Sequence, residues 1–554
     1  MLSGERTPVL VVGGGLVGLS AALFLHYHGI DFVLVERRNG PTMLPRSRGV
    51  HTRTVEMFRQ IGIEDRLQRV GTPAARLNMY GGGRRGSTVI DSVPLYTRTG
   101  RRPEIEARAR NMMSMTDASP SRFCACSQAL LEPILADISR ERGGDLRFGS
   151  ELADFTQDDG GVSAVVTDVA TGQSTAVKAD YLIAADGGGS RVRRALNVAD
   201  WTLPPTHHYL NLFFRADLTD LVRRVRIFPQ CEIVNETVRG IMAPSNNGWT
   251  FHLEYDPAWE SIDDYPDQRC TDLIGTAIGV PDIAVTLLAR GAWDTGVRVA
   301  DDYRRGRVFL AGDAAHQHAP WGGFGANTGI ADAHNLAWKL ASVIKGNATP
   351  TLLDTYQPER RPRAVLACEQ ARLRTDFMAR YGVRTAENAS SLERQLDGGA
   401  VMTRYRYMSQ AVVTDQASGG DWVDHLAGQP GTRLPHVWLN ANGQQVSTLD
   451  LCGPGFVLLV TEDAAGWRSA AETVRGRTGQ DVVVHEIGPD SELADPEGNW
   501  PEQVALPTGG AILVRPDQHV AARSDQGLSP DILLPALRSL QGHALTNTVR
   551  ATTR

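Results

Sequence analysis

Near the N-terminus, a strand-like apolar run leads into closely spaced glycines and then into a helical pattern. The apolar run covers residues 7–12, and the glycines are Gly13, Gly15 and Gly18. Gly13 permits the turn, Gly15 lets backbone amides approach a pyrophosphate, and Gly18 allows the helix to pack closely on the strand. This order of strand, glycines and helix predicts the start of a βαβ unit.

An acidic residue follows at the end of the next expected strand. Residues 32–35 are apolar and end in Glu36, 18 residues after Gly18. A carboxylate at this place can accept hydrogen bonds from both hydroxyls of an adenosine ribose. The unit is therefore predicted to bind a dinucleotide, and the motif alone does not choose between NAD and FAD.

A second carboxylate ends another expected strand, far along the chain. Residues 307–311 form a short run that is apolar after Arg307 and ends in Gly312 and Asp313, and ligands of open α/β sheets bind at such carboxyl ends. Glycines follow at positions 322, 323, 325 and 329. Helical spacing of apolar residues predicts a helix over 329–345, whose N-terminus would favour an anion beside the glycines. The alternative is that Asp313 only caps a turn.

A third strand ends in the same way. Residues 145–178 alternate as strands of a small sheet, and the apolar run 181–185, typical of a buried parallel strand, ends in Asp186. A helix cap is an alternative role for Asp186. Two strand-ending aspartates and a glycine motif in one chain favour a common ligand site.

Composition limits the class of protein. A chain of 554 residues is too long for a single core, and the net charge of −6, without a sustained basic block, argues against nucleic acid or an anionic membrane as partner. No apolar run reaches the roughly 18 residues of a membrane span, and the first apolar run ends in glycines rather than as a signal peptide. The scattered cysteines and histidines have no metal-ligand spacing, so we expect no metal. We expect a cytoplasmic protein whose Cys124 and Cys126 are buried side chains rather than a redox pair.

Three segments taken together resemble a known family. VVGGGLVGLSAA with Glu36, ADGGGSRVR, and RVFLAGDAAHQHAPWGGFGANTGIADAHNLAWKL are similar in order and spacing to the FAD-dependent aromatic hydroxylases, the class A flavoprotein monooxygenases. The tail, which includes LVRPDQHVAAR, resembles the thioredoxin-like C-terminal domain of the phenol and polyketide hydroxylase branch. It lacks both cysteines of a redox-active thioredoxin, so we expect a structural role for it.

The resemblance implies an α/β protein with a Rossmann-like FAD-binding domain, a β-sheet substrate domain and a C-terminal thioredoxin-like domain. The FAD-binding domain would be discontinuous and comprise residues 1–75, 121–195 and 290–400. Residues 76–120 and 196–289 would form the substrate domain, and residues 401–554 the redox-inactive thioredoxin-like domain.

The resemblance also implies the residues that contact the cofactor. Asp313 would bind the ribityl chain or the pyrophosphate, and Ala326 and Asn327 would lie against the flavin ring. The full expected set is Gly13, Gly15, Leu16, Val17, Gly18, Glu36, Arg37, Arg46, Gln128, Asp186, Asp313, Gly323, Ala326 and Asn327. Trp321 and Phe324 are expected on the substrate side.

Two positions depart from the family pattern. Trp321 stands where relatives mostly carry a small or hydroxylated residue, next to the expected flavin, which leaves the shape of the active site open. Gln518 replaces a turn glycine that is common in the tail.

The implied activity is hydroxylation of a phenolic, polycyclic polyketide-type substrate in antibiotic biosynthesis, by a monomer or homodimer. NADPH or NADH would reduce the flavin, and O2 would then form a flavin hydroperoxide that an electron-rich ring attacks. Three alternatives remain open: Baeyer–Villiger oxygenation, flavin redox chemistry without oxygen insertion, and a non-catalytic flavin-binding protein. The sequence identifies no general base.

Overall fold

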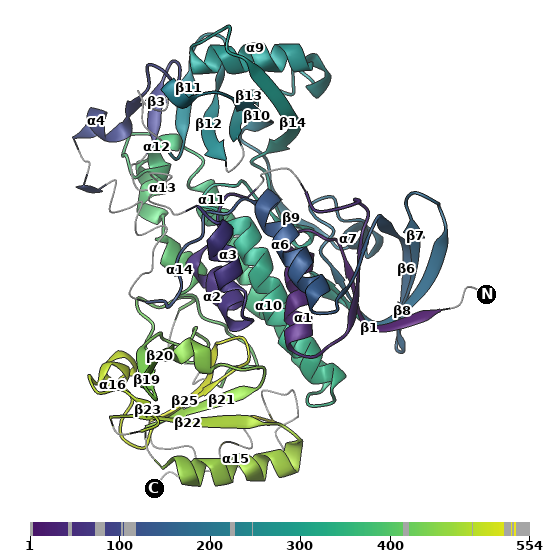
Figure 1. Ribbon diagram of the computed structural model, residues 1–554, viewed down its shortest axis with the longest axis vertical. Helices are drawn as coiled ribbons and strands as arrows, with labels where there is room; N and C mark the ends of the chain where they lie inside the picture. The colour runs from purple at the N-terminus through teal and green to yellow at the C-terminus, as the bar shows by residue number, and fades with distance from the viewer. Residues whose placement is uncertain are drawn as a thin grey trace.

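The computed structural model has three tiers along its long axis (Figure 1): a sheet under helix α9, a central α/β domain, and a tail domain at the opposite end. The structure describes residues 4–42, 47–72, 83–100, 103–104, 118–221, 228–245, 248–413, 420–461, 463–489, 491–525, 533 and 537–538. Among these residues, no helix combines the length and apolar character that crossing a bilayer requires.

The central sheet has the strand order β16-β17-β8-β1-β2-β5, in which the short edge strand β16 (Arg304–Arg305) pairs with β17 in antiparallel fashion. Its parallel strands are β17 (Val308–Leu310), β8 (Ser174–Ala184), β1 (Glu5–Val12) and β2 (Phe32–Glu36), followed by β5 (Asp145–Phe148). The four strands β17, β8, β1 and β2 are buried almost throughout their last residues, which explains their near-continuous apolar sequence.

The expectation of a separate small sheet over residues 145–178 is wrong. Strands β6 (Ser150–Asp158) and β7 (Gly161–Asp168) form a hairpin that continues the central sheet. The reason is the length of β8, whose first half pairs with β7 in antiparallel fashion while its second half pairs with β17.

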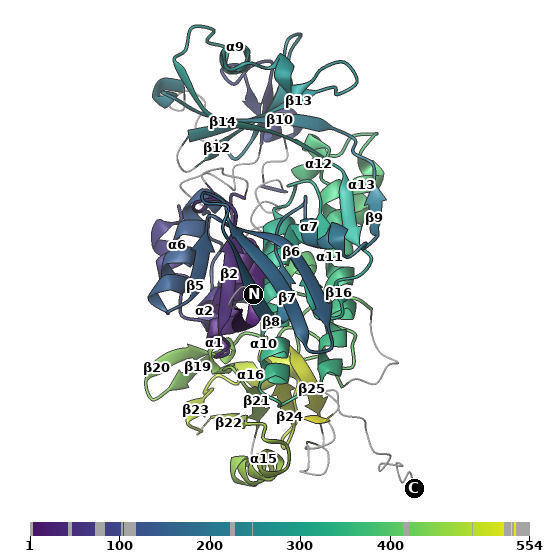
Figure 2. The ribbon, with the colours of Figure 1, turned by 90° about the vertical axis from the view of Figure 1, so that its right-hand side faces the viewer.

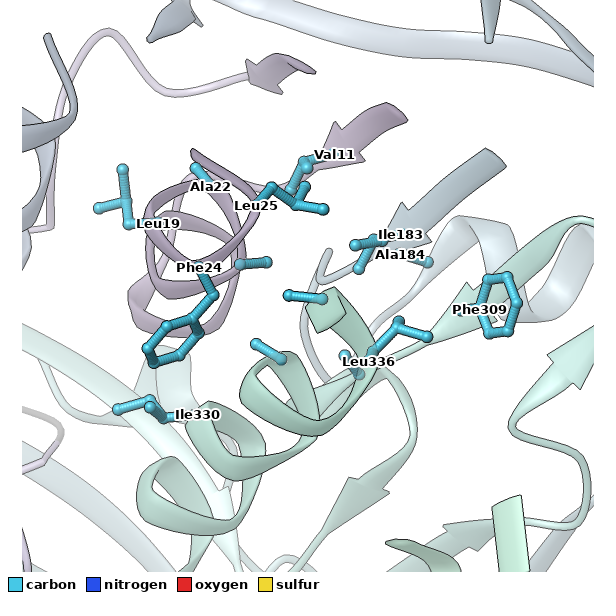
Figure 3. Close-up of a cluster of buried hydrophobic side chains, with 14 of the residues drawn as sticks. Val11, Leu19, Ala22, Phe24, Leu25, Ile183, Ala184, Phe309, Ile330 and Leu336 are labelled. Carbon is cyan, nitrogen blue, oxygen red and sulfur yellow. The ribbon is translucent and has the colours of Figure 1, made fainter. Parts of the chain in front are cut away.

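Helices α1 (Leu16–Tyr27) and α10 (Phe324–Ile344) pack together on this sheet. Figure 3 shows Phe24 of α1 directed towards α10, with Ile330 and Leu336 on α10 and Ile183 on β8 nearby. Both helices are rich in small residues, so their axes come close and bury nearly every position of α10 up to Ala341.

Helix α10 begins at Phe324, five residues before the expected start at Gly329. Gly323, at φ +69°, caps the helix in the left-handed region that glycine tolerates. Gly329 lies inside the helix, where a Cβ would be 2.8 Å from Gly312 Cα. A glycine is therefore needed at position 329 because α10 packs closely on the turn at Gly312, not because the chain forms a loop there.

Other helices surround the central sheet. They are α2 (Thr52–Gln60), α3 (Glu64–Val70), α6 (Gln128–Glu141), α7 (Arg191–Ala195) and α11 (Tyr356–Arg372).

The second sheet has the order β14-β10-β13-β12-β11-β3-β4. Its main strands are β10 (His208–Ala216), β11 (Cys231–Val234), β12 (Arg239–Ser245), β13 (Gly248–Tyr255) and β14 (Val285–Asp294), with short β3 (Arg84–Gly86) and β4 (Val93–Pro94) at the edge. Helix α9 (Asp267–Ile278) packs on the face that carries Leu212, Phe214 and Phe251. A small sheet of β9 (Asp200–Leu203), β15 (Val297–Ala300) and β18 (His316–Gln317) links this tier to the central domain.

The tail domain contains a sheet of order β20-β19-β23-β22-β21-β24-β25. Its first three strands are β20 (Gln444–Ser447), β19 (Trp438–Ala441) and the short β23 (Leu493–Ala494). Strand β21 (Phe456–Val460) pairs in parallel with β22 (Val482–Gly488) and in antiparallel fashion with β24 (Ala511–Val514), which continues to β25 (Val520–Ser524). Helix α15 (Ala464–Thr478) covers this sheet at the end of the molecule (Figure 2). The α/β architecture, with a central sheet, a second sheet, a small three-stranded sheet and a tail sheet, agrees with the expected fold class. The expected domain boundaries stay a prediction.

Candidate functional site

The three sequence motifs meet at one edge of the central sheet. Val12 pairs with Ala184, and Ala184 with Leu310, so the strands β1, β8 and β17 end side by side. The backbone continues this alignment, because Ala185 N donates to Val12 O at 2.8 Å and Ala311 N to Ala184 O at 2.9 Å. The glycine motif and both aspartates therefore leave the sheet at its carboxyl edge, where ligands of such sheets bind.

The glycines of the first turn are required by close contacts. A Cβ at Gly18 would lie 1.8 Å from Gly13 O, and one at Gly13, where φ is +108°, would lie 2.3 Å from Ala185 O. Gly15 differs, since a Cβ there would meet only Glu132 Oε1, at 3.5 Å. Gly13 and Gly18 thus hold the turn together. Gly15 keeps the N-terminus of α1, beginning with Leu16 and Val17, accessible to an anion.

Glu36 is buried at the end of β2 and is held by hydrogen bonds. Its Oε2 accepts from Gly14 N at 2.7 Å, and its Oε1 accepts from the backbone N and the Nε of Arg38, both at 2.9 Å. Burial alone would raise the pKa of Glu36, but these hydrogen bonds and the charge of Arg38 lower it. Arg37, which was expected beside Glu36, is exposed. The ion-pair partner of Glu36 is Arg38 instead.

Gln128 donates a hydrogen bond to Glu132, a buried carboxylate that was not among the expected site residues. Gln128 Nε2 donates to Glu132 Oε1 at 2.7 Å, one turn along α6, and Thr42 N donates to Glu132 Oε2 at 2.7 Å. Glu132 is fully buried, and burial raises its pKa. The i, i+4 spacing after Gln128 was the available sequence signal for this residue. Arg46 lies outside the described residues.

One carboxylate oxygen of Asp186 caps a helix, and the other accepts no hydrogen bond from the described residues. Its Oδ2 accepts from Arg191 N at 2.8 Å and from Val192 N at 3.2 Å, at the start of α7. Its Oδ1 is buried without a hydrogen-bond partner in the described structure. The capping role and a ligand role are therefore compatible.

Asp313 is exposed in the turn after β17, and a buried carboxylate, Asp332, which no sequence pattern indicated, holds this turn. Asp332 of α10 accepts from Gly312 N at 3.1 Å, from His316 Nε2 at 2.8 Å and from Arg360 Nε at 2.8 Å. Burial would raise the pKa of Asp332, but Arg360 and His316 outweigh this effect and lower it. Asp332 thus fixes the turn that presents Asp313.

The loop before α10 is pinned to the segment that precedes α2. His51 Nε2 lies 3.1 Å from Gly322 O, and Asn327 Oδ1 accepts from His51 N at 2.9 Å. Asn327 Nδ2 also donates to Gly323 O at 2.8 Å. Burial lowers the pKa of His51 to about 4, so its ring is neutral at pH 7 and donates from Nε2. Ala326 is half-buried in the same first turn of α10.

Trp321 joins an aromatic cluster on the face of the second sheet opposite α9. Its ring lies 6.1 Å from Tyr209, 6.3 Å from His252 and 5.6 Å from Trp293, each in an edge-on arrangement. The guanidinium of Arg380 lies 3.6 Å from the centre of the Trp321 ring. Trp321 therefore bridges the loop before α10 and the second sheet.

Phe324 belongs to a different cluster from Trp321. It is fully buried against Ala367, Ala371, Val401 and Met402. The structure does not bring it together with the aromatic face, and its substrate-side role stays a prediction.

Comparison with known proteins identifies this arrangement. Residues 6–371 match the model of the FAD binding domain family, and residues 427–544 match that of the aromatic-ring hydroxylase C-terminal domain. The chain belongs to the FAD-dependent aromatic-ring hydroxylases. It is thus a flavoprotein monooxygenase with FAD as cofactor, and the fold class expected from the sequence is confirmed.

Individual relatives match over nearly the whole length. Tetracenomycin A2 monooxygenase-dioxygenase of Streptomyces glaucescens is 39% identical over 543 residues, covering 95% of this chain and 94% of the relative. Aklavinone 12-hydroxylase RdmE of Streptomyces purpurascens is 34% identical over 552 residues, covering 95% and 96%. The crystal structure of aklavinone-11 hydroxylase with FAD and aklavinone superposes with a TM-score of 0.84 at 32% identity, covering 98% and 100%.

Proposed function

We propose that this protein uses NAD(P)H and O2 to hydroxylate a polycyclic aromatic, polyketide-type substrate. The observation that carries the proposal is the position of the loop 319–323, which joins the sheet edge where the FAD motifs converge to the aromatic face of the second sheet. The names of relatives support the substrate class, since two Streptomyces relatives, 39% and 36% identical to this chain, are named putative polyketide hydroxylases.

The residues at the sheet edge fit FAD. The amides at the start of α1 offer positive partial charge to the pyrophosphate near Gly15. Glu36 can accept hydrogen bonds from the ribose hydroxyls if these replace its hydrogen bond from Arg38. The unpartnered Oδ1 of Asp186 and the exposed Asp313 offer acceptors for hydroxyl groups. We propose these assignments, together with Gln128, Ala326 and Asn327, as the cofactor contacts.

When bound, FAD supplies the redox chemistry between NAD(P)H, O2 and the aromatic ring. The chain itself supplies position and electrostatics. The N-terminus of α10, opened by Gly323, offers backbone amides to an anionic ring. His51 and Asn327 hold this turn in place by hydrogen bonds, and the buried indole of Trp321 keeps water from the side that faces the second sheet.

The proposal is tested with purified protein. We expect the absorption bands of bound flavin, NADPH oxidation that depends on a polycyclic phenol, and a product that gains one oxygen on an unchanged skeleton. A ring-expanded or cleaved product would indicate Baeyer–Villiger chemistry instead. Protein that neither contains nor takes up FAD would contradict the proposal.

A further inference from the structure

Arg380 is a buried cation whose hydrogen-bond partners are all neutral. It ends helix α12 (Phe377–Arg380) and is 6% exposed. Its Nη1 donates to Gln230 Oε1 at 2.6 Å, while Nε and Nη2 donate to the carbonyls of Arg374 and Thr375 at 3.1 and 3.2 Å. Figures 1 and 2 both place α12 between the second sheet and the central domain.

Arg48 is a second cation at the same place. Its Nη1 donates to Pro229 O at 3.4 Å and to Pro244 O at 3.5 Å, which are long contacts to neutral acceptors. Pro229 immediately precedes Gln230, the partner of Arg380, so the two guanidiniums approach the same stretch of chain before β11. Both charges also act on His252, whose pKa burial lowers to about 3 with a further contribution from each arginine.

Within the described residues, neither guanidinium has a carboxylate oxygen within 4.0 Å. The acids on the neighbouring strands are engaged elsewhere. Glu232 lies 3.0 Å from Arg85 Nε, and Glu254 lies 3.2 Å from Arg239 Nε. Glu232 therefore acts on Arg380 only from beyond contact distance. Because burial disfavours a cation that lacks a counter-charge in contact, a ligand that places a negative charge against these guanidiniums would be stabilised electrostatically.

The surroundings also contain polar atoms without partners. These are Trp321 Nε1, His252 Nδ1 and Asn211 Oδ1, each buried without a hydrogen bond in the described structure. Asn211 and His252 are paired neighbours on the sheet face that Trp321 contacts. An apolar planar ligand alone would leave these atoms unsatisfied, whereas a ring that carries oxygen substituents would supply partners for them.

We propose that Arg48 and Arg380 together bind an anionic oxygen of the aromatic substrate, a carboxylate or an ionised phenol, with Trp321 packing beside its ring. The inference rests on the proposed function and narrows its substrate class to ring systems that are anionic at neutral pH. Asn327 Nδ2 donates to Gly49 O at 3.3 Å, next to Arg48, so the anchored ring lies beside the turn assigned to the flavin.

The test compares two probes of the same shape, anthracene-2-carboxylate and the neutral anthracene-2-carboxamide, by fluorescence titration of the FAD-containing protein. We expect the carboxylate to bind at least about tenfold more tightly, since a hydrogen bond to a charged group contributes roughly 1.5–3 kcal/mol. Arg380→Gln and Arg48→Gln should each weaken carboxylate binding at least about tenfold and change carboxamide binding less than about twofold. Arg380→Lys should retain most of the carboxylate affinity because it keeps the charge.

The matched control is Arg239→Gln, which removes an exposed cation from the same sheet and should change neither affinity. Failure of the carboxylate to bind, equal affinities for the two probes, or unchanged carboxylate binding in both Arg48→Gln and Arg380→Gln would overturn the inference. A raised KM for NADPH with unchanged carboxylate binding would assign the guanidiniums to the nicotinamide cofactor and also overturn it. If the wild-type protein contains FAD and oxidises NADPH with a phenol while these results occur, only the anion inference fails and the proposed function stands.

Discussion

Gln518 offers a test of how the tail domain is attached to the FAD-binding region. It lies in the turn between β24 and β25, is 1% exposed, and has φ +65°, in the left-handed region that favours glycine. Its Oε1 accepts from Arg53 Nη1 of α2 at 2.6 Å, and its Nε2 donates to Leu449 O at 3.3 Å. A strained residue is therefore retained where its side chain joins two tiers of the molecule.

The two effects have opposite signs and can be separated. Replacement by glycine relieves about 1 kcal/mol of left-handed strain, whereas replacement by alanine relieves none. Both replacements remove an acceptor from a buried cation, at a cost of roughly 1.5–3 kcal/mol. Arg53 keeps Glu56 Oε2 at 3.0 Å and Asp517 O at 3.1 Å, which favours the lower end of that range. We expect Gln518→Ala to destabilise by about 2 kcal/mol and Gln518→Gly by about 1 kcal/mol.

The assay is urea unfolding followed by tryptophan fluorescence, with bound FAD measured in parallel. Wild type should have the highest midpoint, then Gln518→Gly, then Gln518→Ala. The control is Asn442→Gly. Asn442 is exposed, has φ +51° and lies in the hairpin between β19 (Trp438–Ala441) and β20 (Gln444–Ser447). The urea midpoint of this variant should equal that of the wild type or be slightly higher. Equal midpoints for the two Gln518 variants would refute the strain argument. A Gln518→Gly variant more stable than the wild type would show that the hydrogen bond from Arg53 contributes less than the strain costs.

Three further predictions concern the FAD region. Gly18→Ala should abolish FAD binding or folding, because its Cβ would lie 1.8 Å from Gly13 O; flavin absorbance and solubility of the purified variant measure this, and normal FAD content would contradict it. Asp313→Ala should weaken FAD retention during dialysis while the circular dichroism of the fold is unchanged, and full retention would show that the carboxylate is not a contact. The pKa of His51 falls from 6.5 to about 4 on folding, so between these values the unfolded chain binds a proton that the folded chain does not, and stability decreases as pH falls. His51→Gln should therefore reduce the stability lost between pH 6.5 and 4.5, with a slope smaller by up to about 1.4 kcal/mol per pH unit in urea unfolding, and an identical slope would contradict the burial argument.

Distant charges also connect the tail to α10, in a way that local patterns do not reveal. Arg515 Nη1 and Nη2 donate to the two carboxylate oxygens of Glu359 at 2.6 and 2.9 Å, and Lys339 Nζ of α10 donates to Glu359 Oε2 at 2.8 Å. All three side chains are fully buried. In the sequence, these residues are ordinary charges separated by up to 176 positions (515 − 339).

Local patterns along the chain were enough to predict the buried strands of the central sheet, the glycine turn after β1 and the strand-ending residues Asp186 and Asp313. Strand and helix periodicity and the need for a missing Cβ are local properties of the chain. Gly18 and the apolar end of β8 were readable for this reason, and so was the family. Three features depend on three-dimensional packing: α10 begins at Phe324, Glu132 and Asp332 are buried against Gln128 and the turn of Asp313, and Arg48 and Arg380 approach one segment with no carboxylate of the described residues within 4.0 Å. Such outcomes depend on which side chains packing brings together and which charges it leaves unpaired, and no spacing along a single chain encodes that directly.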